Sequence, residues 1–268
     1  MKKILLLIPV LMISTAFLLK KKNPAQTEIT VCHTASSTED FALLASTQSF
    51  IMLHENPTDL IFESQAGGNM ITFKTPDGTD ASAFVIMAKN KTDNWVFVFQ
   101  EWWGLNDHIK KSAEQLYNDL GNVNVMALDM YDGKVATARE DASKYMGAFK
   151  QDRGNAIVKG ALDYAGRNAK VATIGWCFGG AQSIQAALNA SKQAVACVIY
   201  YGMPESNVER LKTLNCDVLG IFGLKDQGIN QDVVKKFEAS MKEAGKNVTI
   251  KNYDAAHGFA NPSNPIYD

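Results

Sequence analysis

The sequence predicts an α/β fold in which helices cover a mostly parallel sheet. Three observations predict this fold: short apolar runs alternate with amphipathic helical segments, several runs are apolar throughout, and turn residues separate them. Residues 95–99 form one such run, which is typical of a strand buried on both faces. The 268 residues suit one sizeable domain, and 46% apolar with 21% charged residues is an ordinary globular composition.

The strands are predicted from β-prone apolar runs bounded by turn residues. In chain order they cover residues 70–73, 83–87, 95–99, 123–128, 171–174, 195–200, 218–222 and 248–253. The helices are predicted from apolar residues at helical spacing; in the first, Leu105, Ile109, Ala113 and Leu116 share one face and Gly121 ends it. The predicted helices cover residues 105–120, 138–166 with an interruption near Gly154, 181–188 and 234–244.

The N-terminus differs from the rest of the chain. A basic start, an apolar run over residues 4–19 and small residues within it indicate a secretory signal peptide, with an uncleaved anchor or a chance apolar start as alternatives. We therefore assign residues 1–22 to a signal peptide or N-terminal anchor, 23–66 to a linker with room for one helix, and 67–268 to the folded domain. The protein is expected to be exported, periplasmic or secreted, and to contact a membrane only through its N-terminus.

Charge and cysteine content exclude several classes of function. A net charge of −1 without a basic stripe argues against nucleic-acid binding. Cys32, Cys177, Cys197 and Cys216 show no C-x-x-C spacing, so neither a metal site nor a redox motif is expected. Export would permit disulfides, but Cys197 and Cys216 lie in apolar runs and are predicted to be small buried side chains.

The strongest candidate for chemistry is the segment 175–180, Gly-Trp-Cys-Phe-Gly-Gly, where a strand should end and a helix begin. Flanking glycines allow a sharp turn that raises Cys177 above the sheet, and the Phe178 N–H can then face an oxyanion. A helix N-terminus lowers the pKa of a thiol, which favours the nucleophilic thiolate. A buried structural cysteine beside a tight turn is the alternative interpretation.

Two further residues follow predicted strands in the order that a hydrolase triad requires. Asp226 follows the strand that ends at Phe222, and His257 follows the last strand. The order nucleophile, acid, histidine is that of the α/β-hydrolases, in which the histidine moves the proton and the acid holds its tautomer. Asp232 competes with Asp226 but is better placed to begin a helix. The remaining histidines are expected in the linker or on the surface: His33, His54 and His108.

Glu101, Trp102 and Trp103 follow the strand at 95–99, which places a carboxylate beside two indoles at the same sheet edge. The alternative is a helix-start charge accompanied by packing aromatics. Trp103 and Tyr201 could line a substrate pocket or serve packing alone.

These motifs together resemble the dienelactone hydrolase family. The matching segments are Glu101-Trp-Trp-Gly-Leu-Asn, Gly175-Trp-Cys-Phe-Gly-Gly, Gly-Leu-Lys-Asp226 and His257-Gly-Phe-Ala-Asn, from about Asn69 to the C-terminus. The resemblance implies an α/β-hydrolase fold and cofactor-free hydrolysis of a lactone or small ester by a Cys-His-Asp triad. It also implies that Glu101 helps to activate the cysteine and that the Phe178 and Trp102 N–H groups bind the oxyanion.

The chain departs from the family in two places. Arg139 matches the first of two arginines that bind a substrate carboxylate, whereas Asn261 stands where the second is expected; a solvated arginine at a helix start is the alternative for Arg139. The sequence ends at Asp268, where the family continues into a final helix, so one sheet face should expose apolar area. Either the sequence is a fragment or another element covers that face, and the segment 38–54 is the candidate for such an element.

Three functions are consistent with these features. A thiol hydrolase acting on small lactones or esters accounts for all the motifs. A catalytically silent binding protein of the same fold is the alternative, based on the two departures. A peroxide-sensing thiol is a third, because an accessible thiolate also oxidises readily. The sequence does not specify an oligomeric state.

Overall fold

The computed structural model describes residues 36–261, 263, 264 and 267. Residues 35–268 form one compact unit, which contains all the described helices and strands. The predicted signal or anchor, together with Cys32 and His33, lies outside the described residues. Within the described part of the chain, no helix is long and apolar enough to cross a bilayer.

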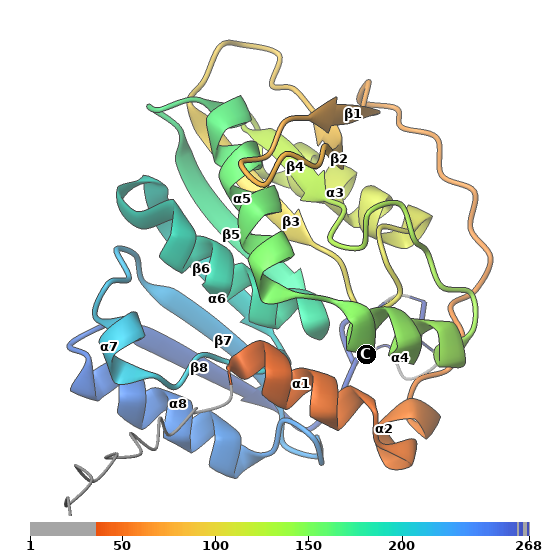
Figure 1. Ribbon diagram of the computed structural model, residues 1–268, viewed down its shortest axis with the longest axis vertical. Coiled ribbons are helices and arrows are strands. Elements are labelled where there is room, and N and C mark those ends of the chain that lie inside the picture. Colours follow the sequence, from red (N-terminus) through yellow and green to blue (C-terminus); the bar gives the residue numbers. More distant parts are fainter. Residues whose placement is uncertain (1–35, 262, 265–266, 268) are drawn as a thin grey trace, which may run out of the picture. The chain divides into compact units, whose positions relative to one another are not determined.

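The unit is built on an eight-stranded sheet with the order β1-β2-β4-β3-β5-β6-β7-β8 (Figure 1). Its strands are β1 (Asn69–Phe73), β2 (Ala81–Ile86), β3 (Asn94–Phe99), β4 (Asn124–Leu128), β5 (Lys170–Trp176), β6 (Ala194–Tyr200), β7 (Val218–Gly223) and β8 (Val248–Tyr253). β2 runs antiparallel to both β1 and β4, and every other pair is parallel. The predicted mostly parallel sheet is therefore confirmed.

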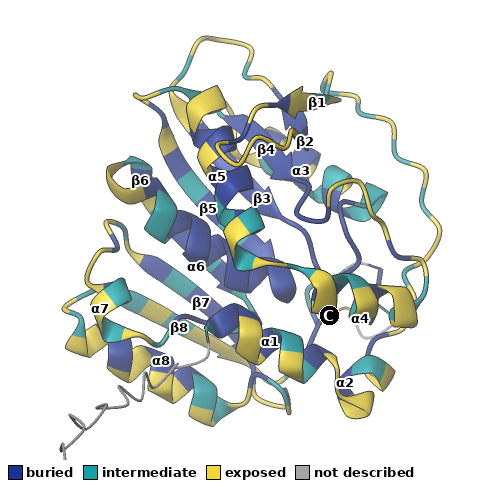
Figure 2. Cartoon of the chain, viewed as in Figure 1, coloured by how far each residue is buried: buried dark blue, intermediate teal, exposed yellow. Residues whose placement is uncertain are grey.

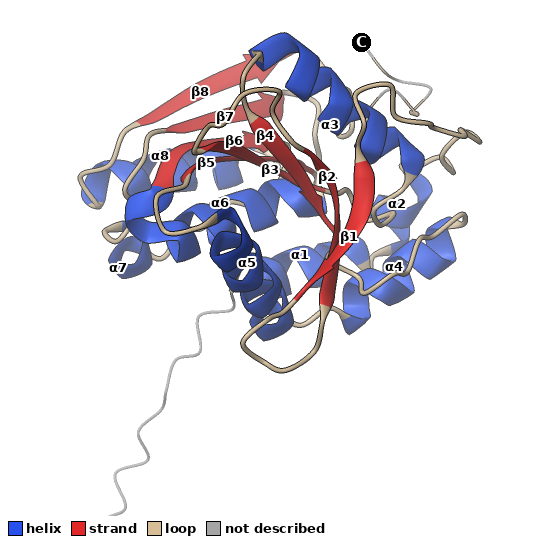
Figure 3. Cartoon of the chain, turned by 90° about the horizontal axis from the view of Figure 1, so that it is seen from above, coloured by secondary structure: helices blue, strands red, loops and turns tan. Residues whose placement is uncertain are grey.

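Helices connect the parallel strands and cover both faces of the sheet. They are α1 (Ser37–Ala45), α2 (Gln48–Met52), α3 (Asp107–Leu120), α4 (Arg139–Ala148), α5 (Gln151–Ala165), α6 (Phe178–Ala190), α7 (Val208–Leu211) and α8 (Gln231–Glu243), with a short 3-10 turn at Ser191–Gln193. Figure 3 shows α3 on one face, whereas α1, α5 and α6 lie on the other. In the described unit, burial is concentrated in the central strands and in α6 (Figure 2).

The burial of the central strands β3 and β4 on both faces follows from their sequences. β3 and β4 are apolar at almost every position and are buried along nearly their whole length. On one face, Val96 and Val98 pack against Ile109 and Ala113 of α3. Burial on both faces explains why these strands do not alternate apolar and polar residues. Because β3, β5, β6, β7 and β8 are parallel, the loops after them begin at one edge of the sheet.

The interruption predicted near Gly154 is wrong in position. The break lies at residues 149–150, between α4 and α5, and Gly154 lies inside α5. A Cβ at Gly154 would come within 2.6 Å of the Phe149 ring, so this glycine permits close packing and does not end the helix.

One part of the sheet remains open on the face that carries α3. Tyr200, Ile221, Tyr253 and Phe259 line a hollow of about 630 Å³ there, and Tyr253 is half exposed. After β8, no helix occurs among the described residues 254–261, 263, 264 and 267.

The expectation that segment 38–54 covers this open face is wrong. α1 packs against α4 and α6, on the opposite face from α3 (Figure 3). The reason is the apolar side of the segment, because Phe41, Ala45 and Phe50 are buried in the same cluster as Phe178. α1 and α2 therefore lie beside the loops that carry the candidate site.

Candidate active site

Cys177 lies at the junction of β5 and α6, where it is the N-cap residue of the helix. Its φ of 58° and ψ of −119° place it in a backbone region that a non-glycine residue rarely adopts. The turn requires glycine on both sides: a Cβ at Gly175 would lie 2.1 Å from the Gly179 carbonyl oxygen, and one at Gly179 would lie 2.3 Å from that of Phe99. The sharp strand-to-helix turn predicted from the sequence is thus present, and it raises the thiol above the sheet edge.

Asp226 and His257 reach the same edge from the loops after β7 and β8. His257 Nδ1 lies 2.6 Å from Asp226 Oδ2. The other carboxylate oxygen accepts hydrogen bonds from the N–H groups of Gly228 and Ile229, both at 2.9 Å. Burial alone would raise the pKa of Asp226, but His257 and these two N–H groups outweigh it and lower the pKa. Asp226 is therefore a fixed carboxylate that orients the imidazole.

Cys177 and His257 are buried neighbours. The cysteine is 1% exposed and the histidine 5%, and a ring nitrogen of His257 lies within 4.8 Å of Cys177 Sγ. Burial opposes the charged imidazolium, but Asp226 and Cys177 raise the pKa of His257 well above its usual value. Burial raises the pKa of the Cys177 thiol, while His257 and the N–H of Phe178 act in the opposite direction. The thiol and the imidazole each affect the pKa of the other, so His257 is close enough to act on the thiol proton.

Glu101 is a buried carboxyl group in the loop after β3. Tyr201 donates its hydroxyl hydrogen to Oε1 at 3.3 Å, and the Asn261 amide donates to Oε2 at 2.5 Å. Burial raises the pKa of Glu101 to about 7, against the opposing effects of His257 and Tyr201. Asn261, which stands at the expected position of the second arginine, therefore holds this glutamate through a neutral amide.

The prediction that His54 lies in the linker or on the surface is wrong. His54 follows α2, is 6% exposed, and packs its ring 4.5 Å from that of Trp102 and 5.2 Å from that of His257. Its Nδ1 lies 2.7 Å from the carbonyl oxygen of Phe50, one helical turn earlier. Burial and the nearby His257 lower the pKa of His54 to about 3, so its ring is neutral at physiological pH.

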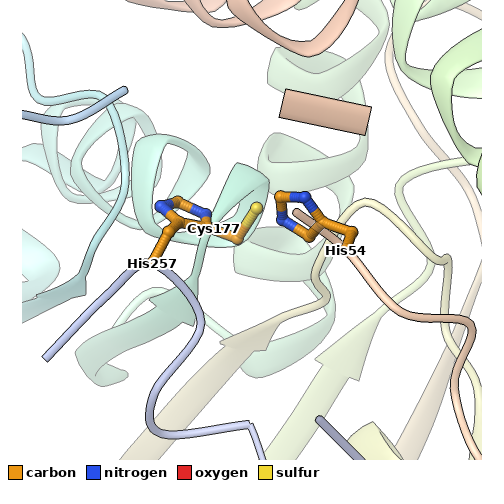
Figure 4. A group of neighbouring side chains, drawn as sticks. All are labelled: His54, Cys177 and His257. Carbon is orange, nitrogen blue, oxygen red and sulfur yellow. The ribbon is translucent and has the colours of Figure 1, made fainter. Parts of the chain in front are cut away.

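Figure 4 shows the sulfur of Cys177 between the imidazole rings of His54 and His257. Sequence reasoning missed His54 because the apolar run before it, residues 50–53, is too short to show strand or helix periodicity. The only local signal is its spacing of four residues from Phe50, which places both side chains on one side of a helical turn. By contrast, His108 on α3 bonds the Thr58 carbonyl oxygen through Nε2 at 2.7 Å and has no part in this cluster.

The aromatic residues predicted near the site are buried around it. Trp102 is fully buried and Trp103 is 2% exposed. The Trp102 ring meets that of Phe50 edge-on, with the ring centres 5.5 Å apart, and the Tyr201 ring lies 5.1 Å from that of His257. Phe178 begins α6, so its N–H belongs to the unpaired first turn of that helix.

Arg139 begins α4 and faces the segment that covers the site. Its Nη2 lies 3.9 Å from Glu55 Oε2, and its Nη1 donates to Met52 Sδ at 3.6 Å. Its charge is close enough to His54 to contribute to the lowered pKa of that ring. Arg139 therefore lies beside His54, on the side of the site that α2 forms.

Comparisons with known proteins agree with this geometry. The sheet order and the loops that carry Cys177, Asp226 and His257 define an α/β-hydrolase fold. A dienelactone hydrolase-like promiscuous phosphotriesterase from metagenomic libraries shares this fold, with a TM-score of 0.63 and 23% identity over 73% of this chain and 85% of that one.

The family profile of the dienelactone hydrolases matches residues 81–268, and the chain belongs to this family of hydrolases. Among its relatives, protein usf of Aquifex pyrophilus is 28% identical over 75% of this chain and 91% of its own length. Carboxymethylenebutenolidase 1 of Cupriavidus pinatubonensis is 25% identical over 76% of this chain and 87% of its own.

Proposed function

We propose that the protein hydrolyses lactones or small carboxylic esters with Cys177 as nucleophile, His257 as proton carrier and Asp226 as its orienting acid. The observation that carries this proposal is the arrangement of the three groups at one edge of the sheet, with His257 Nδ1 2.6 Å from Asp226. The strained turn at Cys177 supports it, because strain of this kind persists where a side chain must be held in one place.

The reaction proceeds in two halves. His257 Nε2 takes the thiol proton while Cys177 Sγ attacks the carbonyl carbon, and the N–H groups of Phe178 and Trp102 bind the resulting oxyanion. The carbon–oxygen bond then breaks, and His257 returns the proton to the leaving alkoxide. In the second half, His257 takes a proton from water, which attacks the thioester and releases the carboxylic acid and the free thiol.

Glu101 assists the first half as an alternative acceptor of the single thiol proton, which it can take in place of His257. A pKa of about 7 leaves this carboxyl partly ionised near neutral pH, so it can accept the thiol proton in a site from which water is excluded. Without substrate, Glu101 instead accepts hydrogen bonds from Tyr201 and Asn261, and these must break before it accepts the thiol proton. The amide of Asn261 is a weaker partner than a charged arginine, so Glu101 should be released at a smaller free-energy cost.

Relatives named carboxymethylenebutenolidase suggest the substrate class. Arg139 supports an anionic group on the substrate, since a guanidinium can bind a carboxylate through two hydrogen bonds. With Asn261 at the second position, we propose a broader range of small esters and lactones in which one negative charge is favourable but not required.

A panel of anionic and neutral esters and lactones, assayed on wild type and Cys177→Ala, tests this proposal. We expect Cys177→Ala to lose nearly all turnover. Cys216→Ala is the matched control, because this cysteine is half-buried before β7 and contacts none of the proposed groups. Retained turnover in Cys177→Ala would exclude the thiol mechanism.

A further inference from the structure

Three buried side chains converge above the nucleophile turn: His54 from the end of α2, Cys177 from the start of α6 and His257 from the loop after β8. One donor atom from each lies within 4.8 Å of the other two (Figure 4). We propose that these three residues form an inhibitory site for a zinc-like transition-metal ion. The metal site itself does not depend on the ester or lactone mechanism, whereas its inhibitory effect rests on the proposed roles of Cys177 and His257.

The hydrogen bonds of the two histidines fix where their lone pairs point. His54 Nδ1 faces the Phe50 carbonyl oxygen, which can only accept, so this nitrogen carries the hydrogen and Nε2 presents a lone pair. His257 Nδ1 faces the Asp226 carboxylate, and the same reasoning leaves the lone pair of the neutral ring on its Nε2. The structure therefore directs both Nε2 atoms to one place beside the Cys177 sulfur, and each presents a lone pair there when its ring is neutral.

Both Nε2 atoms are buried, and neither has a hydrogen-bond partner within the described part of the chain. A buried polar atom without a partner carries a cost of about 1–3 kcal/mol, so two at one point require an explanation. The single hydrogen of the Cys177 thiol can serve only one of them. One cation bound between the three atoms would satisfy both nitrogens together.

The donor set selects the class of ion. Two imidazole nitrogens and one thiolate match zinc and its neighbours in the transition series, whereas Mg²⁺ and Ca²⁺ prefer oxygen ligands. The outer partners also match a metal site, because ligating histidines usually donate their other N–H to a carboxylate or a backbone carbonyl. Asp226 and Phe50 provide one of each.

Binding of the ion requires the three donor atoms to move slightly closer together. Tetrahedral zinc with bonds of about 2.0–2.3 Å places its ligand atoms about 3.5 Å apart, whereas the three donor atoms lie within 4.8 Å of one another. His54 follows the five-residue helix α2, so a small shift of this segment can close the gap.

The ion would displace the single proton that Cys177 and His257 Nε2 hold between them, form a zinc–sulfur bond, and bind both imidazoles through their lone pairs. It would occupy the nucleophilic sulfur and the nitrogen of His257 that has to accept a proton. It would also fasten the segment 48–54 across the site, which excludes substrate. Such an ion therefore inhibits the enzyme and takes no part in turnover.

Cobalt(II) titration of the full chain tests the site without relying on activity. We expect one equivalent to give the intense visible bands of four-coordinate cobalt and a thiolate-to-cobalt charge-transfer band. Cys177→Ser should abolish the charge-transfer band. His54→Phe, which keeps an aromatic ring in the packed position, should weaken cobalt and zinc binding by at least the roughly 10–100-fold that loss of an outer ligand partner costs.

His108→Ala is the matched control, because it removes a histidine on α3 outside the cluster. It should leave metal affinity unchanged. Zinc inhibition, expressed for each variant relative to its own activity without metal, should weaken in parallel with the cobalt affinity of His54→Phe. A wild-type chain that gives no charge-transfer band, or one whose metal affinity His54→Phe leaves unchanged, overturns the proposal; loss of esterase activity in Cys177→Ala leaves it untouched.

Discussion

Replacing Glu101 with glutamine should change how the stability of the protein depends on pH. Burial raises the pKa of this carboxyl from 4.5 to about 7. A carboxyl group with a raised pKa in the folded state favours folding while it is protonated, and this stabilisation is lost as the pH rises through the folded-state pKa. The difference corresponds to about 3 kcal/mol, because each pKa unit is worth about 1.36 kcal/mol.

Urea unfolding of wild type and Glu101→Gln between about pH 4.5 and about pH 8 measures this effect. Glutamine is neutral at every pH, so subtracting the two unfolding free energies cancels the groups that titrate alike in both chains. We expect wild type to lose about 3 kcal/mol relative to Glu101→Gln across that range. A difference that stays constant with pH, or that changes in the other direction, would refute a protonated, buried Glu101.

Three further substitutions probe the candidate site and the α2 segment beside it. Asp226→Asn should lower kcat about 10⁴-fold, as loss of an aspartate that fixes the histidine tautomer does. Asp232→Asn, at the exposed start of α8, should leave kcat unchanged. Similar losses of kcat in both variants would show that Asp226 acts only through stability. Phe50→Ala removes the ring that packs 5.2 Å from that of His257. Iodoacetamide should then label Cys177 at least about tenfold faster, because opening of the α2 segment costs less free energy. Unchanged labelling would show that α2 does not limit access to Cys177. Arg139→Ala should raise KM about tenfold for anionic esters only, since a hydrogen bond to a charged group is worth about 1.5–3 kcal/mol. An equal rise in KM for neutral esters would contradict a carboxylate-binding role.

The parts of the site that follow strands were predictable from the sequence because their signals are local. Cys177 lies in a turn that its neighbouring glycines define, and Asp226 and His257 follow β-prone segments that form β7 and β8. Parallel strands bring their following loops to one edge, so three local predictions combined into one geometric prediction.

The parts that could not be predicted depend on packing between distant segments. Nothing near His54 in the sequence indicates that α2 lies over the nucleophile; that follows from Phe50 being buried against Trp102 and His257. The contact between Asn261 and Glu101 is of the same kind, since an amide carries no signal of its partner. The helix break was misplaced because a glycine that allows close packing has the same sequence signal as one that ends a helix.

The most direct test of the thiol mechanism is to trap its covalent intermediate. The enzyme is mixed with p-nitrophenyl acetate, quenched in acid during the first turnover, digested and analysed by mass spectrometry. We expect an acetyl thioester on the peptide that contains Cys177 in wild type, and no acetyl group on that peptide in Cys177→Ala. An acetyl group on any other residue, or rapid turnover with Cys177 replaced by alanine, would contradict the account.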